Sequence, residues 1–200
     1  MIWNLLALAF GGACLVVWLM GARALWPLGD WRERALTARS FAKAIECRAP
    51  QRDGAAEERE RLVRLTAEAA GLRPASTARL RLAATLADVG YAAVPYDILL
   101  GDAEGRAETA VLARHAEIGS AMIELVPGAE AVAPLVRLES GTPELKREAD
   151  VLAAASAYVQ TSRRQGADAA LDCLTAGSGT LYNEAAVRSV LAVVDVRGRA

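Results

Sequence analysis

The amino-terminal stretch "MIWNLLALAFGGACLVVWLMGA", residues 1–22, limits what this chain can fold into more than any other feature. It contains no Asp, Glu, Lys, Arg or His. A helix of about 20 apolar residues is long enough to cross the hydrocarbon core of a bilayer. A cleaved signal peptide is the alternative, but such a peptide carries lysine or arginine before its apolar stretch, and here there is none. The sequence therefore predicts a single transmembrane helix over residues 1–22.

The distribution of positive charge predicts the orientation of this helix. Arg23, Arg32, Arg34 and Arg39 follow the apolar stretch, and no basic side chain precedes it. Because cytoplasmic flanks of membrane helices are enriched in lysine and arginine, we expect the amino terminus outside and the rest in the cytoplasm. All four tryptophans fall within residues 3–31, where indole rings can lie at the headgroup level. The predicted location is the inner (cytoplasmic) membrane, with a single pass.

Composition limits the cytoplasmic part to one domain. A chain of 200 residues with 54% hydrophobic content can form one core. The formal net charge is −1 and the charges are spread along the chain, which argues against a nucleic-acid surface. Cys14, Cys47 and Cys173 are odd in number and far apart, so they predict neither a disulfide framework nor a CxxC zinc site.

Periodicity predicts that this domain is all-α. We expect a juxtamembrane linker helix within residues 23–46, mainly from Trp31 to Ile45, then a loop over residues 48–54. No stretch alternates convincingly as a strand would. Gly71 is expected to end one helix, and Ser76 or Thr77 to cap the next. The predicted helices of the domain, which covers residues 47–200, are 56–70, 77–88, 107–125, 147–163 and 183–194.

Five segments taken in order resemble a known family. They are "FAKAIECRAPQRDG", "LRLAATLADVGYAAVPYDILL", "ARHAEIGSAMIELVPGAEAVAPLVR", "ASAYVQTS" and "GSGTLYNEAAV". Together they are similar to the signature stretches of the HD-GYP domain, the bacterial metal-dependent phosphodiesterases that hydrolyse cyclic di-GMP. The resemblance covers about residues 40–194 and implies an HD-domain-like helical bundle.

The same resemblance implies that most metal ligands of the family are missing. Asp88 and His115 match two ligand positions, whereas Ala55, Ala87 and Ser156 stand where the family has other ligands. The loop that carries the Gly-Tyr-Pro motif is deleted after Arg137. His115 is also the only histidine of the chain, and a histidine-rich metal cluster cannot be built from one imidazole. We therefore expect no metal cofactor and no catalysis of the family type.

These observations favour a catalytically inactive protein that acts through protein–protein contacts. The sequence predicts a scaffold or accessory subunit of a bacterial membrane complex, with other membrane or cytoplasmic proteins as partners and self-association possible. One alternative is a sensor or relay for cyclic di-GMP or another nucleotide. Another is a residual metal-dependent phosphohydrolase, in which Glu117 or Glu139 would assist Asp88 and His115.

The vacated site and two polar segments complete the sequence-based expectations. The vacated site could accept a small molecule, with Arg114 and Arg137 as candidate phosphate contacts. The run "EERER", residues 57–61, is typical of a solvated helix face. "GSGT", residues 177–180, lacks the lysine of a P-loop and suits the connection to the last helix.

Overall fold

The computed structural model describes residues 31–100, 114–126, 128–138 and 142–198 of the chain. The predicted transmembrane helix, residues 1–22, lies outside this described part. None of the helices within these ranges combines the length and the apolar character needed to cross a bilayer.

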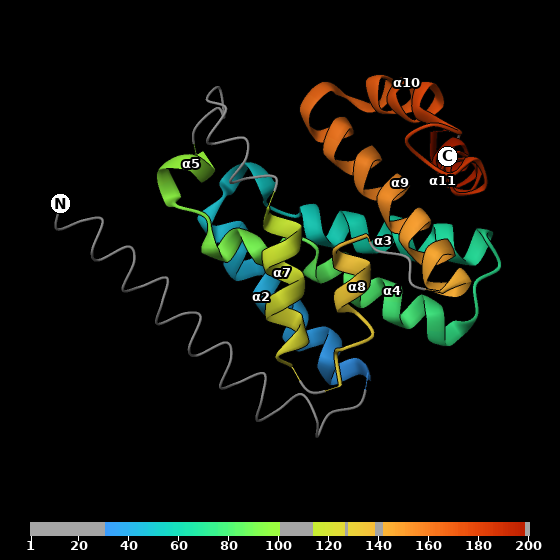
Figure 1. Cartoon of the computed structure of the whole chain (residues 1–200). Helices are drawn as coiled ribbons and strands as arrows, with labels where there is room; N and C mark the ends of the chain where they lie inside the picture. Colours follow the sequence, from blue (N-terminus) through green and yellow to red (C-terminus); the bar gives the residue numbers. More distant parts are fainter. Residues whose placement is uncertain (1–30, 101–113, 127, 139–141, 199–200) are drawn as a thin grey trace, which may run out of the picture.

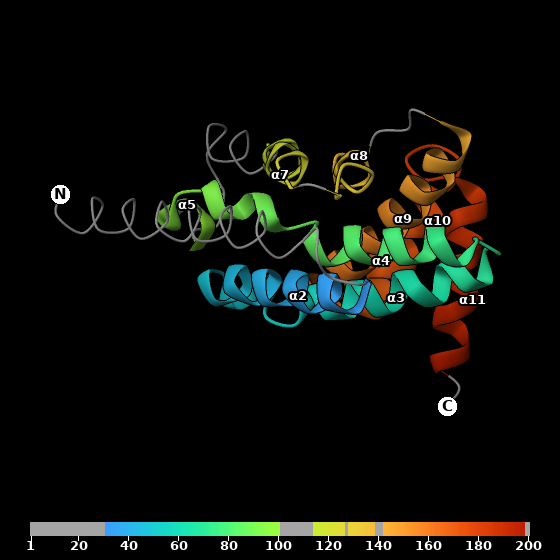
Figure 2. The same ribbon diagram turned by 90° about the horizontal axis from the view of Figure 1, so that it is seen from below.

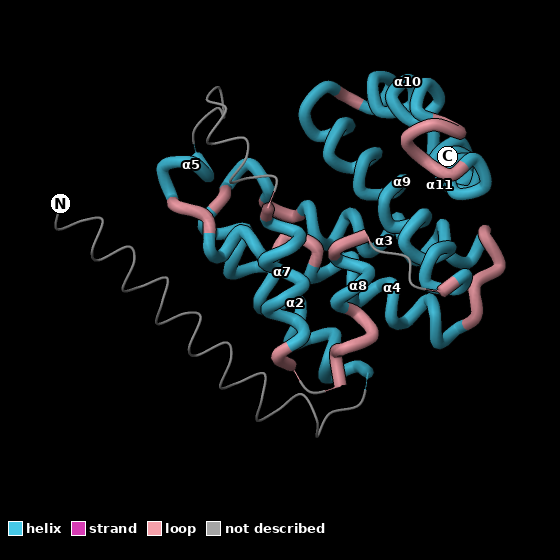
Figure 3. Tube along the Cα trace, in the orientation of Figure 1, coloured by secondary structure: helices cyan, strands magenta, loops and turns pink. Residues whose placement is uncertain are grey.

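The predicted all-α class is confirmed for the described residues, which form nine α-helices and two short 3-10 helices but no strand (Figures 1 and 3). The only pairing of the β type in this part of the chain is an isolated bridge between Ser178 and Tyr182. The elements are α2 (Trp31–Arg48), η1 (Pro50–Arg52), α3 (Ala55–Ala69), α4 (Pro74–Leu86), η2 (Val89–Ala93), α5 (Tyr96–Leu100), α7 (His115–Glu124), α8 (Ala133–Val136), α9 (Pro143–Gln165), α10 (Ala167–Gly177) and α11 (Glu184–Gly198).

Helix α4 occupies the centre of the bundle. It packs against α2 and α3 on one side and against α8 and α9 on the other, as the two perpendicular views in Figures 1 and 2 show. Its Leu80, Ala83 and Ala84 are fully buried in the main core. Because α4 carries small alanines as well as leucines, neighbouring helices can approach it from several sides.

The turn between α3 and α4 follows local chemistry at Gly71. The Leu72 amide donates to the Ala67 carbonyl at 2.9 Å and the Gly71 amide to the Glu68 carbonyl at 3.0 Å, which is a Schellman motif. Gly71 takes the left-handed φ of 66° that this motif requires, so the predicted helix end is confirmed.

The predicted start of the next helix is wrong. Helix α4 begins at Pro74, before Ser76 and Thr77, because proline fits the first helical turn. The Ser76 hydroxyl donates to the Glu144 carboxylate at 2.7 Å instead of capping its own helix.

Helix α9 is the longest described helix and runs antiparallel to α3. Arg147, near its start, donates to the Ala70 carbonyl just beyond the end of α3, and Arg163, near its end, pairs with Glu58 in the first turns of α3. The Thr142 hydroxyl caps α9, so the helix begins before the predicted residue 147.

The remaining predictions are confirmed in part. Helices α3 and α11 agree with the predicted ranges to within a few residues, and α7 matches the later part of the predicted helix over 107–125, whose residues 107–113 lie outside the described part. Helices α5, α8 and α10 were not predicted; the first two are too short to show a period, and α10 follows α9 after Gly166 alone.

Helix α2 packs into the domain, although the sequence predicted a separate linker helix within residues 23–46. Ala38 is fully buried in the main core, and Ile45 belongs to a second apolar cluster with Tyr91. At its end, the Arg48 guanidinium donates to the backbone carbonyls of Tyr91, Ala92 and Val94. Helix α2 is therefore tied directly to η2, the segment that carries the candidate site.

Candidate functional site

Asp88 lies at the carboxyl end of α4, between the helix and η2. Gly90, two residues later in η2, touches the backbone of α7. A Cβ atom on Gly90 would lie 1.8 Å from the His115 carbonyl oxygen and 2.8 Å from the Gly119 nitrogen. Glycine is thus required for η2 and α7 to pack this closely.

This contact brings His115 to η2. The His115 and Tyr91 rings stack with their centroids 4.2 Å apart and their planes 7° from parallel. Asp88 and His115, the two residues expected to remain of a metal site, are therefore both placed beside Tyr91.

Both oxygens of the Asp88 carboxylate face guanidinium groups. Arg59 Nη2 donates to Asp88 Oδ2 at 3.0 Å, and Arg59 Nε donates to the Ala84 carbonyl at 2.8 Å. Arg52 Nη1 lies 3.5 Å from Asp88 Oδ1. A planar guanidinium suits this role because it presents several N–H donors in fixed directions.

Arg52 also binds Tyr91. Its Nη2 donates to the Tyr91 hydroxyl at 2.9 Å, and its Cζ lies 4.0 Å from the centroid of the ring. Such a position over an aromatic face is favourable for a cation. We refer to Arg52, Arg59, Asp88, Tyr91 and His115 together as the Asp88 cluster.

The Asp88 cluster is a charged group within the protein interior. The side chain of Arg59 is 1% exposed, that of Asp88 11% and that of Arg52 17%. Burial raises the pKa of Asp88, but the charges of Arg59 and Arg52 and the hydrogen bond from Arg59 outweigh burial and hold this pKa below its usual value. Burial also raises the pKa of Tyr91, so its hydroxyl is neutral near pH 7.

The predicted vacated positions lie on, or directly after, three helices that pack against one another, α3, α4 and α9. Ala87 directly precedes Asp88, and buried Ala55 begins α3 one turn before Arg59. Ser156 is half-buried on α9, which packs against α3.

The residues proposed to assist the site are exposed, half-buried or outside the described part. Arg114 pairs with Glu117 at 3.4 Å, and both side chains are exposed. Arg137 lies 3.2 Å from Glu124. Glu139 lies outside the described residues.

The donor set around Asp88 does not suit a metal ion. Within the described ranges, no three His, Cys, Asp or Glu side chains are placed so that they could hold one together. Metal sites need several such ligands, supported by hydrogen-bonded neighbours. Here two guanidinium groups already surround the carboxylate that would have to coordinate the ion.

The sequence interpretation missed both arginines. The sequence predicts a solvated face for the run "EERER", and this is wrong for its centre, because Arg59 and Glu60 are buried. Arg59 is buried because it lies on the apolar face of α3, where its guanidinium reaches Asp88. Helical spacing could have indicated this, since the buried positions of α3 are Ala55, Ala56, Arg59, Glu60, Leu62, Val63, Thr66 and Ala67.

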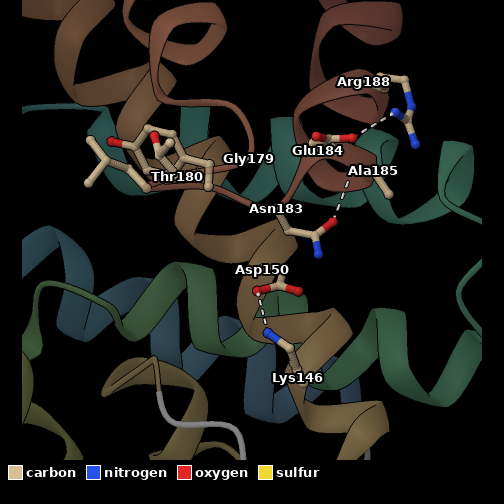
Figure 4. Close-up of a pocket in the computed structure, with 10 residues that line it drawn as sticks. Lys146, Asp150, Gly179, Thr180, Asn183, Glu184, Ala185 and Arg188 are labelled. Atoms are coloured by element: carbon tan, nitrogen blue, oxygen red, sulfur yellow. Dashed lines mark hydrogen bonds and ion pairs between the residues drawn. The ribbon is translucent and has the colours of Figure 1, made fainter.

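A hollow lies between the first turns of α9 and the start of α11 (Figure 4). It is an open, polar hollow of about 560 Å³ between Lys146 and Asp150 on α9 and the segment from Gly179 to Arg188. Its charged groups are paired with each other, Lys146 with Asp150 and Glu184 with Arg188. The "GSGT" segment borders this hollow and connects α10 to α11, as the sequence predicted.

Comparison of the chain with protein-family models, with curated proteins and with solved structures gives no match.

Proposed function

We propose that this chain is a catalytically inactive, membrane-anchored, HD-GYP-like protein that works as a scaffold or accessory subunit of a bacterial membrane complex. The observation that carries the proposal is the pairing of Asp88 with Arg59 and Arg52. The resemblance places a metal-binding aspartate at this position, but here its negative charge is balanced by guanidinium groups. A hydrolase of this kind needs the metal to activate water, and arginine cannot do this.

The fold gives the proposal a second support. The described residues form helices and no strand, which is compatible with the proposed HD-domain-like bundle, and α7 carries His115 beside η2. The bundle thus keeps its packing around the position of the site, although the ligands of that site are mostly replaced.

The position of α2 supports an anchored role. Helix α2 begins shortly after the predicted transmembrane helix, and it is packed into the domain through Ala38, Ile45 and Arg48. A membrane helix joined to such an element would hold the whole domain close to the bilayer surface. The domain itself could then contact other proteins at the bilayer surface.

A pull-down from the native membrane tests this proposal. The full-length chain, extracted in mild detergent, is isolated from the membrane, and co-purifying proteins are identified and quantified by mass spectrometry. A matched chain that lacks residues 1–22 separates partners of the domain from partners of the membrane helix.

We expect a stoichiometric partner that stays bound to the domain in both chains. A protein that is isolated alone and that hydrolyses a phosphodiester in a manner dependent on Asp88 and His115 would contradict the proposal.

A further inference from the structure

The Asp88 cluster carries more positive than negative charge. Arg52 and Arg59 share one carboxylate, that of Asp88. Arg48 adds a third guanidinium at the same segment, where its described hydrogen bonds go to three backbone carbonyls of residues 91–94. Burial and the charge of Asp88 raise the pKa of Tyr91, while Arg52 and, more weakly, Arg164 at the end of α9 act to lower it. Arg163, which precedes Arg164, donates to the Asp53 carbonyl and pairs with Glu58, so the end of α9 lies next to the segment that carries Arg52.

A second charged cluster among the described residues is balanced. At the opposite end of α4, Arg73 and Arg79 face Glu144 and Glu148, with Ser76 bound to Glu144. We refer to these five residues as the α4–α9 cluster. Buried charges are expensive unless each is paired. The surplus of positive charge at the Asp88 cluster is therefore not found at the α4–α9 cluster, where each arginine has a glutamate partner.

Arg52 is the member of the Asp88 cluster that is best placed to bind a further anion. Its side chain is 17% exposed, whereas that of Arg59 is 1% exposed. A guanidinium has five N–H donors. Arg52 uses one nitrogen for the Tyr91 hydroxyl and makes only a long contact of 3.5 Å with Asp88. Donor hydrogens remain for a second acceptor.

We propose that Arg52 binds a phosphate-type oxyanion at the solvent-accessible side of the Asp88 cluster, with Arg164 adding attraction at longer range. Two parallel N–H···O bonds from one guanidinium match the geometry of phosphate oxygens. An oxyanion bound there neutralises the positive charge that the single carboxylate of Asp88 does not balance. This site goes beyond the scaffold role, and it does not depend on the identity of any protein partner.

Calorimetric titration of the full-length chain with inorganic phosphate, in a neutral detergent and at constant ionic strength, tests the proposal. We expect one phosphate per chain. Arg52→Gln should weaken binding at least about tenfold, because a charge-assisted bidentate contact is lost. Arg61→Gln removes an exposed arginine from α3 and serves as the matched control, with binding unchanged.

Arg164→Gln provides a second variant on the surface, where folding is not at risk. We expect it to weaken phosphate binding severalfold, and more strongly at low salt than at high salt. Absence of binding both to phosphate and to the phospholipid of the titration below, or equal binding by wild type and Arg52→Gln, would overturn the proposal.

The same titration with phosphatidylglycerol in mixed micelles distinguishes a free oxyanion from a lipid headgroup. Binding that depends on Arg52 in the phosphate arm identifies a soluble ligand. Binding that depends on Arg52 only in the lipid arm identifies the headgroup as the source of the oxyanion. The pull-down from native membranes is independent of both arms, so failure of this proposal leaves the scaffold role standing.

Discussion

Charged side chains are paired at both ends of α4, but the balance of positive and negative charge differs between the two ends. At its amino end, the α4–α9 cluster pairs two arginines with two glutamates, and the fully buried Glu148 receives two hydrogen bonds from Arg79. At its carboxyl end, Asp88 alone faces Arg59 and Arg52. A balanced cluster is sufficient to join two helices. An unbalanced one has capacity for a further negative group, and this marks it as the candidate functional site.

Loss of an arginine should lower the free energy of unfolding more at the amino end of α4, where the charges are balanced. Arg79→Met leaves Glu148 as a fully buried carboxylate without its guanidinium partner. We expect a loss of about 3–5 kcal/mol in the free energy of unfolding, measured by chemical denaturation. The double variant Arg79→Met, Glu148→Gln should recover a large part of this loss. Equal stability of the single and double variants would contradict the pairing.

Disruption of the close contact between η2 and α7 should cause the next largest loss in unfolding free energy. In Gly90→Ala, the added Cβ meets the backbone of His115 and Gly119, so the two segments must separate. We expect a loss of about 2–4 kcal/mol in unfolding free energy. Gly71→Ala is the matched control: its φ is left-handed but no atom lies within 4 Å of the added Cβ, so we expect only about 1 kcal/mol.

How far the sequence allowed the fold to be predicted depends on the length of each element. Helix α3 and its end at Gly71 follow from periodicity and turn chemistry, and both were predicted. Helices α5 and α8 are single turns whose existence depends on tertiary packing, and α10 is separated from α9 by Gly166 only. Such elements carry too little local signal to be distinguished from loops.

The site was predictable only in part, for a similar reason. Asp88 and His115 were singled out by resemblance, and the structure places both beside Tyr91. Arg52 and Arg59 were not, because an arginine in a polar run is normally solvated and its burial is decided by what faces it. Arg59 faces Asp88, which is 29 positions away in the sequence.

Loss of the Asp88 charge should have an intermediate effect that depends on pH. Asp88→Asn removes the carboxylate from two guanidinium groups, and we expect a loss of about 1–3 kcal/mol at pH 7. The pKa of Asp88 in the folded state is below its ordinary value of 3.8, so its charge stabilises the fold above that pH. As the pH falls below 3.8 towards the folded pKa, the wild type loses this contribution.

The difference in unfolding free energy between wild type and Asp88→Asn should therefore shrink on acidification below pH 3.8, as measured by denaturation at a series of pH values. A difference that stays constant over this range would mean that Asp88 is not charged in the folded protein.

Loss of an exposed ion pair should have the smallest effect on the free energy of unfolding. Arg64 and Glu68 form an ion pair one turn apart on α3, 3.0 Å long and largely exposed. Arg64→Ala should change the unfolding free energy by less than about 0.5 kcal/mol, because water and salt screen such pairs. A loss as large as that of Asp88→Asn would show that burial does not separate the two kinds of pair.

The central claim, that arginines take the place of a metal ion beside Asp88, is tested most directly by the metal content of the purified full-length chain. Elemental analysis is carried out after purification without chelator and again after incubation with manganese, iron or zinc and removal of the excess. We expect far less than one ion per chain in both samples. One ion or more per chain, lost in both Asp88→Ala and His115→Ala, would contradict the claim.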